Sequence, residues 1–177
     1  MDIIDQDQHK TLRMTVLTTP DMANFSGHVH GGAMLKLLDE VAFACASRYA
    51  HHYVVTLSVD QVVFREPMHV GELITFLASV NYTGNTSLEV GIRTIAENIV
   101  AKTSRHVMTC YFTMVALDEQ SRRPTAVPPL TVTTADERRR YEAAVLRRSF
   151  RKEVERRSLE IRRAPHSAAS ELPDSSS

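Results

Sequence analysis

The stretch from Asn24 to Asp39 contains the residues whose types and spacing suggest chemistry. Gly31 and Gly32 occur where a loop rich in Pro, Asn, Ser and Gly meets a run dominated by Ala, Leu and Met. Glycine lets a ligand approach the backbone closely, and the free N–H groups of a helix's first turn can bind an anion or a developing oxyanion. The pair is therefore a candidate oxyanion site. The alternative is a tight turn that merely starts a helix.

Asp39 is the second informative residue, because it interrupts the apolar run between Leu38 and Ala42. Aspartate is a poor helix former and is costly to bury without partners. A buried Asp39 would be a candidate general base. A carboxylate that instead reaches Lys36 would be an ordinary surface group. Both interpretations of Asp39 remain open from the sequence.

Hydrolysis of an acyl thioester requires a base or nucleophile, an oxyanion site and a group that orients water. Asp39, the N–H of Gly31 or Gly32, and Asn24 could supply these roles without a metal. His28 and His30 form an H-x-H pattern, but a metal site would need further ligands at suitable spacing, and none is evident. His30 fits better as a polar loop residue that hydrogen-bonds near the site.

Other catalytic classes lack their sequence signatures. The chain has no G-x-S-x-G, no Walker-type loop and no dinucleotide-binding glycine loop. Cys45 and Cys110 are not in a C-x-x-C, and we interpret both as buried thiols.

The totals describe an ordinary globular chain. It has 177 residues, 43% hydrophobic and 24% charged, and a formal net charge of zero. These values predict one domain and argue against a nucleic-acid-coating protein. The polar, acidic N-terminus is unlike a signal peptide, and no run is long and apolar enough to span a bilayer. We therefore expect a cytoplasmic protein without a membrane partner.

Residue patterns predict an α+β order of strand, helix and then four strands. Segments rich in β-branched residues are bounded by Gly, Pro and Asn turns, whereas the helical run contains neither Gly nor Pro. We expect a curved antiparallel sheet of five to six strands wrapped around one apolar helix. The alternatives are a helix packed on one side of an open sheet, or a helix buried by oligomerisation. The predicted strands are 11–18, 53–65, 72–82, 86–96 and 103–117, and the helix is 33–50.

The C-terminal part differs in composition. A Pro-rich connection at 124–135 precedes a highly charged run at 136–163, which predicts a second helix with acidic residues at its start and arginines at its end. The last residues are small and polar, which is typical of disorder. We therefore divide the chain into a main domain (1–130), a helical extension (131–163) and a disordered tail (164–177).

These motifs together resemble the hotdog-fold acyl-CoA thioesterases, and most closely the cytosolic acyl-CoA hydrolase subfamily. The resemblance covers residues 11–157. It rests on the order of several short motifs rather than on any one of them. The residues that carry it are Asn24, Gly27, His30, Gly31, Gly32 and Asp39, then Thr56 to Asp60, Phe64, Pro67, Gly71, Gly84 to Ser87, and Cys110 to Val115.

The resemblance implies that fatty acyl-CoA is hydrolysed to fatty acid and CoA, with no cofactor beyond the CoA of the substrate. It implies that Asp39 acts as general base or nucleophile, and that Asn24 reaches it from a partner chain. The Gly31 N–H would hold the thioester oxygen. One hotdog domain per chain implies an obligatory homodimer and, by resemblance, a homohexamer built as a trimer of dimers.

Further residues are candidates for substrate binding. CoA carries phosphates, so Lys102, Arg105 and His106 could line the mouth of the site, with a solvated loop as the alternative. By resemblance, Ser58 matches a polar position of relatives, and Gly84, Thr86 and Ser87 belong to a family hairpin. Two other functions remain open: a non-catalytic acyl-CoA-binding sensor, and a hydratase or dehydratase acting on enoyl thioesters.

Overall fold

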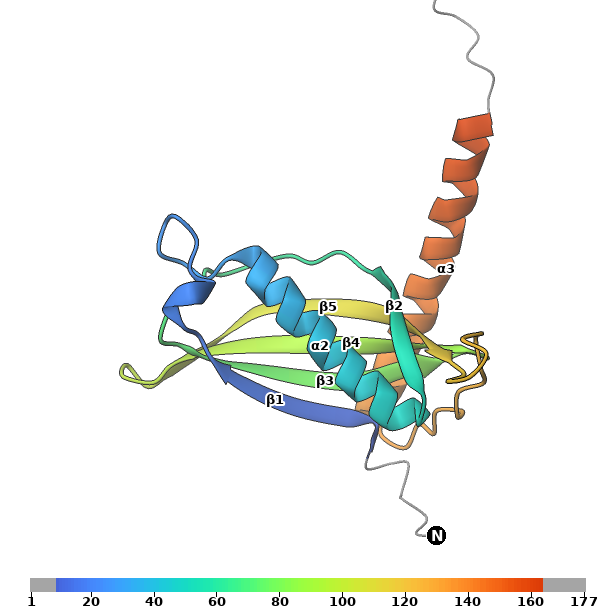
Figure 1. Cartoon of the computed structure of the whole chain (residues 1–177), viewed down its shortest axis with the longest axis horizontal. Coiled ribbons are helices and arrows are strands. Elements are labelled where there is room, and N and C mark those ends of the chain that lie inside the picture. The colour runs from blue at the N-terminus through green and yellow to red at the C-terminus, as the bar shows by residue number, and fades with distance from the viewer. Residues whose placement is uncertain (1–8, 164–177) are drawn as a thin grey trace, which may run out of the picture.

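A computed structural model describes residues 9–163, which form one five-stranded antiparallel sheet with a long helix on each side (Figure 1). The sheet order is β1-β3-β4-β5-β2. Its strands are β1 (Thr11–Leu17), β2 (Tyr53–Val59), β3 (Leu73–Thr83), β4 (Ser87–Asn98) and β5 (Thr103–Leu117). The hotdog fold and the five-strand form of the prediction are confirmed.

The sheet is built around two tight hairpins. β3 pairs with β4 and β4 with β5, both antiparallel, and residues alternate between a buried and a less buried side along β5. The side that faces the first long helix carries the core, including Ile74, Phe76, Ile92 and Met108. β1 and β2 are the two edge strands of the sheet. β2 therefore pairs only with β5, and the other edge of β2 is open.

Helix α2 (Gly31–Ala50) packs on the concave face of the sheet (Figure 1). Its buried residues recur at helical spacing and face the strands, whereas Leu35 and Phe43 on the other side are 42% and 38% exposed. The sheet therefore encloses one side of α2 and leaves the other side open.

Several predicted boundaries shift for local reasons. α2 begins two residues earlier than predicted, because His30 caps it and both glycines are helical. β2 ends at Val59 rather than at 65, and a bulge between Thr56 and Ser58 shifts its register against β5. The following residues still run beside β5, where the Arg65 N–H donates to the Val107 carbonyl at 2.9 Å.

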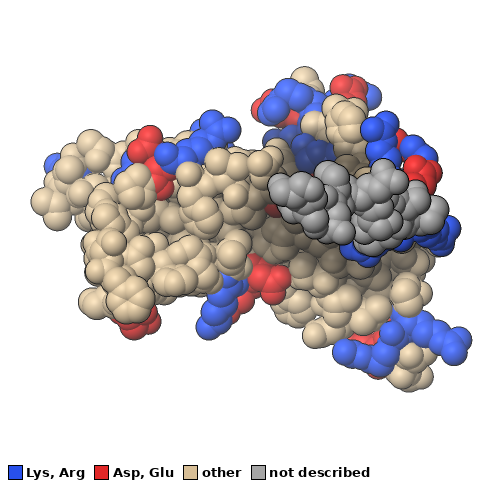
Figure 2. Space-filling view, turned by 90° about the horizontal axis from the view of Figure 1, so that it is seen from above, with Lys and Arg blue, Asp and Glu red and all other residues tan. Residues whose placement is uncertain are grey.

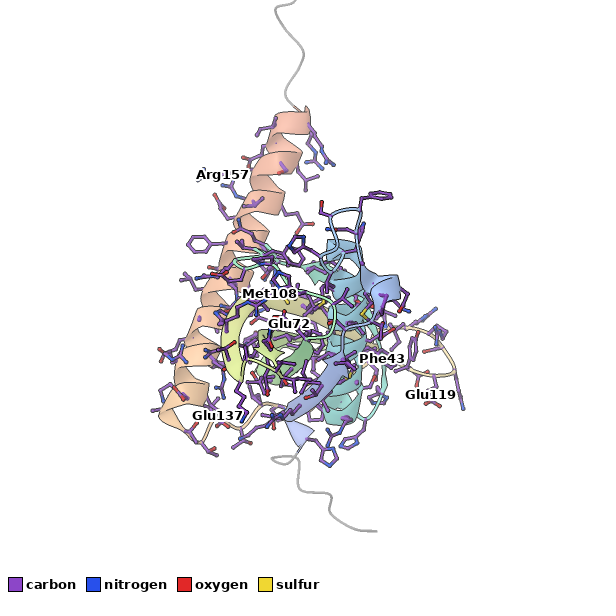
Figure 3. All side chains as sticks on the ribbon, turned by 90° about the vertical axis from the view of Figure 1, so that its left-hand side faces the viewer. Phe43, Glu72, Met108, Glu119, Glu137 and Arg157 are labelled. Carbon is purple, nitrogen blue, oxygen red and sulfur yellow. The ribbon has the colours of Figure 1, made fainter. Side chains whose placement is uncertain are left out.

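Helix α3 (Ala135–Arg163) lies on the outer face of the sheet, opposite α2 (Figure 3). Thr134 and Glu137 form a reciprocal capping box at its start, with N–H to side-chain oxygen distances of 3.2 and 3.1 Å. Its first half is docked by buried contacts. Arg147 pairs with buried Glu89 at 2.6 Å and stacks over the Tyr111 ring at 3.4 Å.

Two remaining predictions concern the cysteines and the membrane. Cys45 and Cys110 are both buried, as predicted, and burial raises the pKa of each thiol to about 12. None of the helices within residues 9–163 is long and apolar enough to cross a membrane. The tail predicted at 164–177 lies outside the described residues.

Candidate active site

Asp39 lies on the open side of α2, where it accepts a hydrogen bond from edge strand β2. The Thr56 hydroxyl donates to Asp39 Oδ1 at 2.6 Å, and Asp39 is exposed in the single chain. Lys36 pairs instead with Glu40, at 3.8 Å. Asp39 is therefore neither buried within one chain nor the partner of Lys36. It is an accessible carboxylate held by a hydroxyl from another element.

The start of α2 presents a free backbone donor at Gly31. The His30 Nδ1 atom accepts the Gly32 N–H at 2.8 Å, so that donor is already used. Within residues 9–163, no hydrogen bond uses the Gly31 N–H. A Cβ placed at Gly31 would lie 3.6 Å from the Phe64 ring. Of the two glycines proposed for an oxyanion, Gly31 is thus the one with an available N–H at the positive end of the helix dipole.

Asn24 belongs to residues 23–30, which precede α2 in the chain. This short loop projects beyond the N-terminal end of α2 (Figure 1). Its Oδ1 accepts the N–H groups of Ser26 and His28 at 2.9 and 3.1 Å, and its own N–H donates to the His28 carbonyl at 2.7 Å. Gly27 makes the turn possible with a φ of +77°. These bonds fix the loop and do not involve the Asn24 side-chain NH₂ group.

The candidate catalytic groups are not gathered within one chain. Asp39 follows Gly31 by two helical turns, which is about 12 Å along the axis. No hydrogen bond among the described residues joins Asn24 to Asp39. The loop of Asn24 and the carboxylate of Asp39 therefore belong to separate parts of the surface.

The surface around Asp39 and Thr56 is apolar and borders the open edge of β2. Leu57 of β2 is 68% exposed. Figure 2, seen from above, shows Lys and Arg side chains gathered toward the right-hand side of the molecule, where α3 lies in Figure 1. An open strand edge beside exposed apolar side chains is typical of a protein–protein interface. The other exposed apolar residues on or near it are Leu35, Phe43, Val59, Val63 and Phe64.

Apart from Ser58 in β2, the predicted substrate-binding residues fall into two groups at opposite ends of the sheet. Gly84, Thr86 and Ser87 belong to the β3–β4 turn, where the Gly84 N–H donates to the Ser87 carbonyl at 2.7 Å. The turn that contains Lys102 joins β4 to β5 at the other end. The 12 residues of β4 separate the two turns by about 36 Å. One bound CoA headgroup cannot contact both turns of the same chain.

The second group is only partly available for a ligand. Arg105 donates to both carboxylate oxygens of Glu72, at 2.7 and 2.8 Å, and to the Pro67 carbonyl. The Arg105 hydrogen bond holds the pKa of Glu72 below its usual value. His106 lies 2.8 Å from the Met108 carbonyl. Of these three residues only Lys102 is exposed, so CoA binding by Arg105 and His106 stays a prediction.

Sequence reasoning missed Thr56 and placed the polar role at Ser58. The β-bulge explains the difference, because it changes which residues of β2 face α2. Thr56 is opposite buried Met114 and reaches Asp39, whereas Ser58 is opposite Thr113 and lines a groove on the outer face. A threonine near the start of the predicted second strand was the available signal.

Comparisons of sequence with known proteins agree on one family. The model of the thioesterase superfamily matches residues 26–102. Protein VdlD of Helicobacter pylori is 47% identical over 148 residues, which are 84% of each chain. The cytosolic acyl coenzyme A thioester hydrolase of Rattus norvegicus is 34% identical over 128 residues, which span 71% of this chain and 33% of that protein.

Solved structures give the same result. An apo-hexameric acyl-CoA thioesterase superposes with a TM-score of 0.79 at 34% identity, over 82% of this chain and 93% of that one. An acyl-CoA hydrolase from Staphylococcus aureus, in complex with butyryl coenzyme A and coenzyme A, superposes with a TM-score of 0.77 at 27% identity, over 87% and 95%. Solved structures of that hydrolase include three variants, in which an aspartate, an asparagine or a threonine is replaced by alanine.

The family model, the relatives and the shared fold all agree. The chain belongs to the thioesterase superfamily, as a hotdog-fold member among acyl-CoA thioester hydrolases.

Proposed function

We propose that this chain hydrolyses fatty acyl-CoA to a free fatty acid and CoA, with Asp39 as the reactive carboxylate. The observation that carries the proposal is the 2.6 Å hydrogen bond from Thr56 to Asp39 on an accessible, apolar surface. The replaced asparagine, aspartate and threonine of the Staphylococcus aureus hydrolase follow one another by fifteen and seventeen residues. Asn24, Asp39 and Thr56 have the same spacing.

The geometry suits two routes for Asp39. As a general base, the carboxylate takes a proton from water while the hydroxyl oxygen attacks the thioester carbonyl carbon. As a nucleophile, a carboxylate oxygen forms a mixed anhydride that water then hydrolyses. In both routes the C–S bond breaks and CoA leaves as a thiolate that gains a proton. Thr56 occupies Oδ1 and so leaves Oδ2, the second carboxylate oxygen, to take the proton from water or to attack the carbonyl carbon.

The oxyanion that develops on the carbonyl requires a preorganised donor. The free Gly31 N–H at the start of α2 provides one, supported by the positive end of the helix dipole. His30 contributes by holding the Gly32 N–H at 2.8 Å, which fixes the first turn of the helix. His30 is thus a positioning residue in this scheme.

Two copies of the chain complete the site in this proposal. β2 has an open edge beside Asp39 and Thr56, and a second copy that pairs there buries the exposed apolar residues. Asn24 of the partner then reaches Asp39 and orients the water or the substrate. A homodimer is the minimum active unit, and a hexamer of three such dimers accords with the hexameric relatives.

No cofactor beyond the CoA of the substrate takes part in this scheme, and we place the protein in the cytoplasm. Lys102 is the cation best situated for a CoA phosphate. Lys102 is exposed in the β4–β5 turn, where its backbone adopts the left-handed conformation with a φ of 55°.

The test is release of free thiol from acyl-CoAs between acetyl and palmitoyl, followed with a thiol-reactive dye. Asp39→Asn should reduce kcat at least about 1000-fold, because the reactive carboxylate is lost. Glu40→Gln is the matched control, since the adjacent carboxylate only pairs with Lys36. Equal loss in both variants, or full activity of Asp39→Asn, would contradict the assignment.

A further inference from the structure

The C-terminal end of α3 extends beyond the sheet on the side of its open edge. Arg151 still contacts the sheet, because it pairs with Asp60, just after β2, at 2.6 Å. Residues 152–163, here called the overhang, continue past that edge, and all of them except Glu153 are exposed (Figure 1). In Figure 3, Arg157 marks the part of α3 that rises above the sheet, while Glu137 lies at its lower end.

The length of the overhang matches an abutting sheet. Twelve helical residues span about 18 Å, and neighbouring strands lie about 4.8 Å apart. α3 runs across the strands rather than along them (Figure 1). A second sheet joined to the β2 edge would therefore lie directly beneath the overhang, which would cover three or four of its strands.

An apolar stripe runs along one side of the overhang and into the docked half of α3. Phe150, Val154 and Ile161 are separated by four and seven residues, so they lie on one side of the helix. Their exposed fractions are 60%, 63% and 75%. Leu159, at 43%, lies roughly on the opposite side of the helix.

A groove beside α3 receives part of this stripe. It has a volume of about 1010 Å³ and lies between α3 and the outer face of the sheet near β2. Phe150 and Val154 line it from the helix, and Leu57 and Ser58 line it from the strand. The groove therefore continues to the same open edge that the overhang crosses.

The overhang has little else to stabilise it in one chain. Ion pairs within the helix join Glu153 to Arg156 and Arg157, and Arg156 to Glu160. Exposed pairs of this kind contribute little, and a free helix of this length is only marginally stable in water. Burial of the stripe against another surface would supply the missing packing.

From these relationships we infer that α3 is a strap across the dimer seam: the overhang of each copy lies in the groove of the other. The two-fold axis of a β2–β2 dimer places the partner's overhang over the outer face of β2 and β5, beside the first copy's α3. The two helices then run antiparallel, with Phe150, Val154 and Ile161 between them. The inference rests on the proposed dimer and assigns its outer layer to α3.

The test compares the dimer dissociation constants of full-length variants by sedimentation equilibrium. Val154→Arg and Ile161→Arg should each weaken the dimer at least tenfold. Leu159→Arg, which adds the same charge on the other side of the helix, should change it less than twofold. A wild-type dissociation constant in both Val154→Arg and Ile161→Arg would overturn the inference. An equal increase of the dissociation constant in these two variants and in Leu159→Arg would overturn it as well. If the stripe variants instead convert a hexamer into dimers of unchanged stability, the stripe lies between dimers. That result would also refute the inference.

Folding of the variants is checked by circular dichroism. If an arginine variant loses helix content, Val154→Ala and Ile161→Ala replace it, because alanine preserves the helix while removing the contact. These should weaken the dimer several-fold, and unchanged dimers would count against the strap. Thiol release by the wild type tests the proposed function separately: a wild type that dimerises through α3 but releases no thiol would refute the function and leave the strap intact.

Discussion

The Thr56 hydroxyl and the Asp39 carboxylate are joined at 2.6 Å across the boundary between the edge strand and the helix. This bond links the position of the proposed reactive group to the placement of β2. It also explains how a carboxylate within an apolar helix keeps one orientation without burial or a cationic partner. The pair is therefore the first target for mutation.

Thr56→Val should lower kcat about tenfold or more with little effect on folding, because a single hydrogen bond to a charged group is worth about 1.5–3 kcal/mol. Thr56→Ser retains the hydroxyl and should preserve most of the activity. Ser58→Ala, on the outer side of the same strand, is the control. Steady-state thiol release measures all three variants. Equal activity of Thr56→Val and the wild type would remove Thr56 from the site.

A shared site makes a specific prediction for mixed dimers. Asn24→Ala and Asp39→Asn should each be nearly inactive alone. After the two are unfolded and refolded together, half of the dimers are mixed, and each mixed dimer has one intact site. Activity should then recover to about a quarter of the wild-type value. Mixtures that stay inactive would mean that Asn24 and Asp39 act within the same chain.

The His30 cap should contribute to helix stability. Its Nδ1 accepts the Gly32 N–H at 2.8 Å, so His30→Ala should lower the free energy of unfolding by about 1 kcal/mol. His30→Asn can accept the same bond and should restore most of that loss. Urea denaturation measures both variants. A kcat loss in His30→Ala that Asn rescues would support the positioning role, whereas a loss that Asn does not rescue would give the imidazole a direct one.

Acid should release the start of α3. The hydrogen bond from Lys10 holds the pKa of Glu137 at about 2 rather than 4.5, with further bonds from Thr133 and Thr134. Because the folded-state pKa is depressed, the stabilisation is present above pH 4.5 and is lost as the pH falls toward 2. Tyrosine fluorescence should report the change, because the Tyr141 ring of α3 lies 5.5 Å from the Tyr82 ring. Glu137→Gln should already lack this acid step, and an identical titration of the variant would exclude Glu137 as its source.

Local patterns in the sequence predicted the secondary structure well and the side-chain contacts poorly. β5 was predicted with the same ends that it has, because β-branched and aromatic residues fill it and turns bound it. The end of β2 at Val59 was missed, because it depends on how far β2 pairs with β5, a strand far along the chain. The exposure of Asp39 and the pairing of Arg105 with Glu72 likewise depend on elements that come together only in the fold.

The strand order also sets the sequence of events during synthesis. β2 follows α2 directly in the chain, yet its only partner is β5, and Tyr53 is in register with Leu117. While a ribosome makes the intervening segment, the strand that contains Thr56 has no ladder to join. The reactive carboxylate thus gains its hydrogen-bond donor only when the last strand is complete. In the proposed scheme activity also requires Asn24 of a partner chain, so thiol release would report both a closed sheet and an assembled dimer.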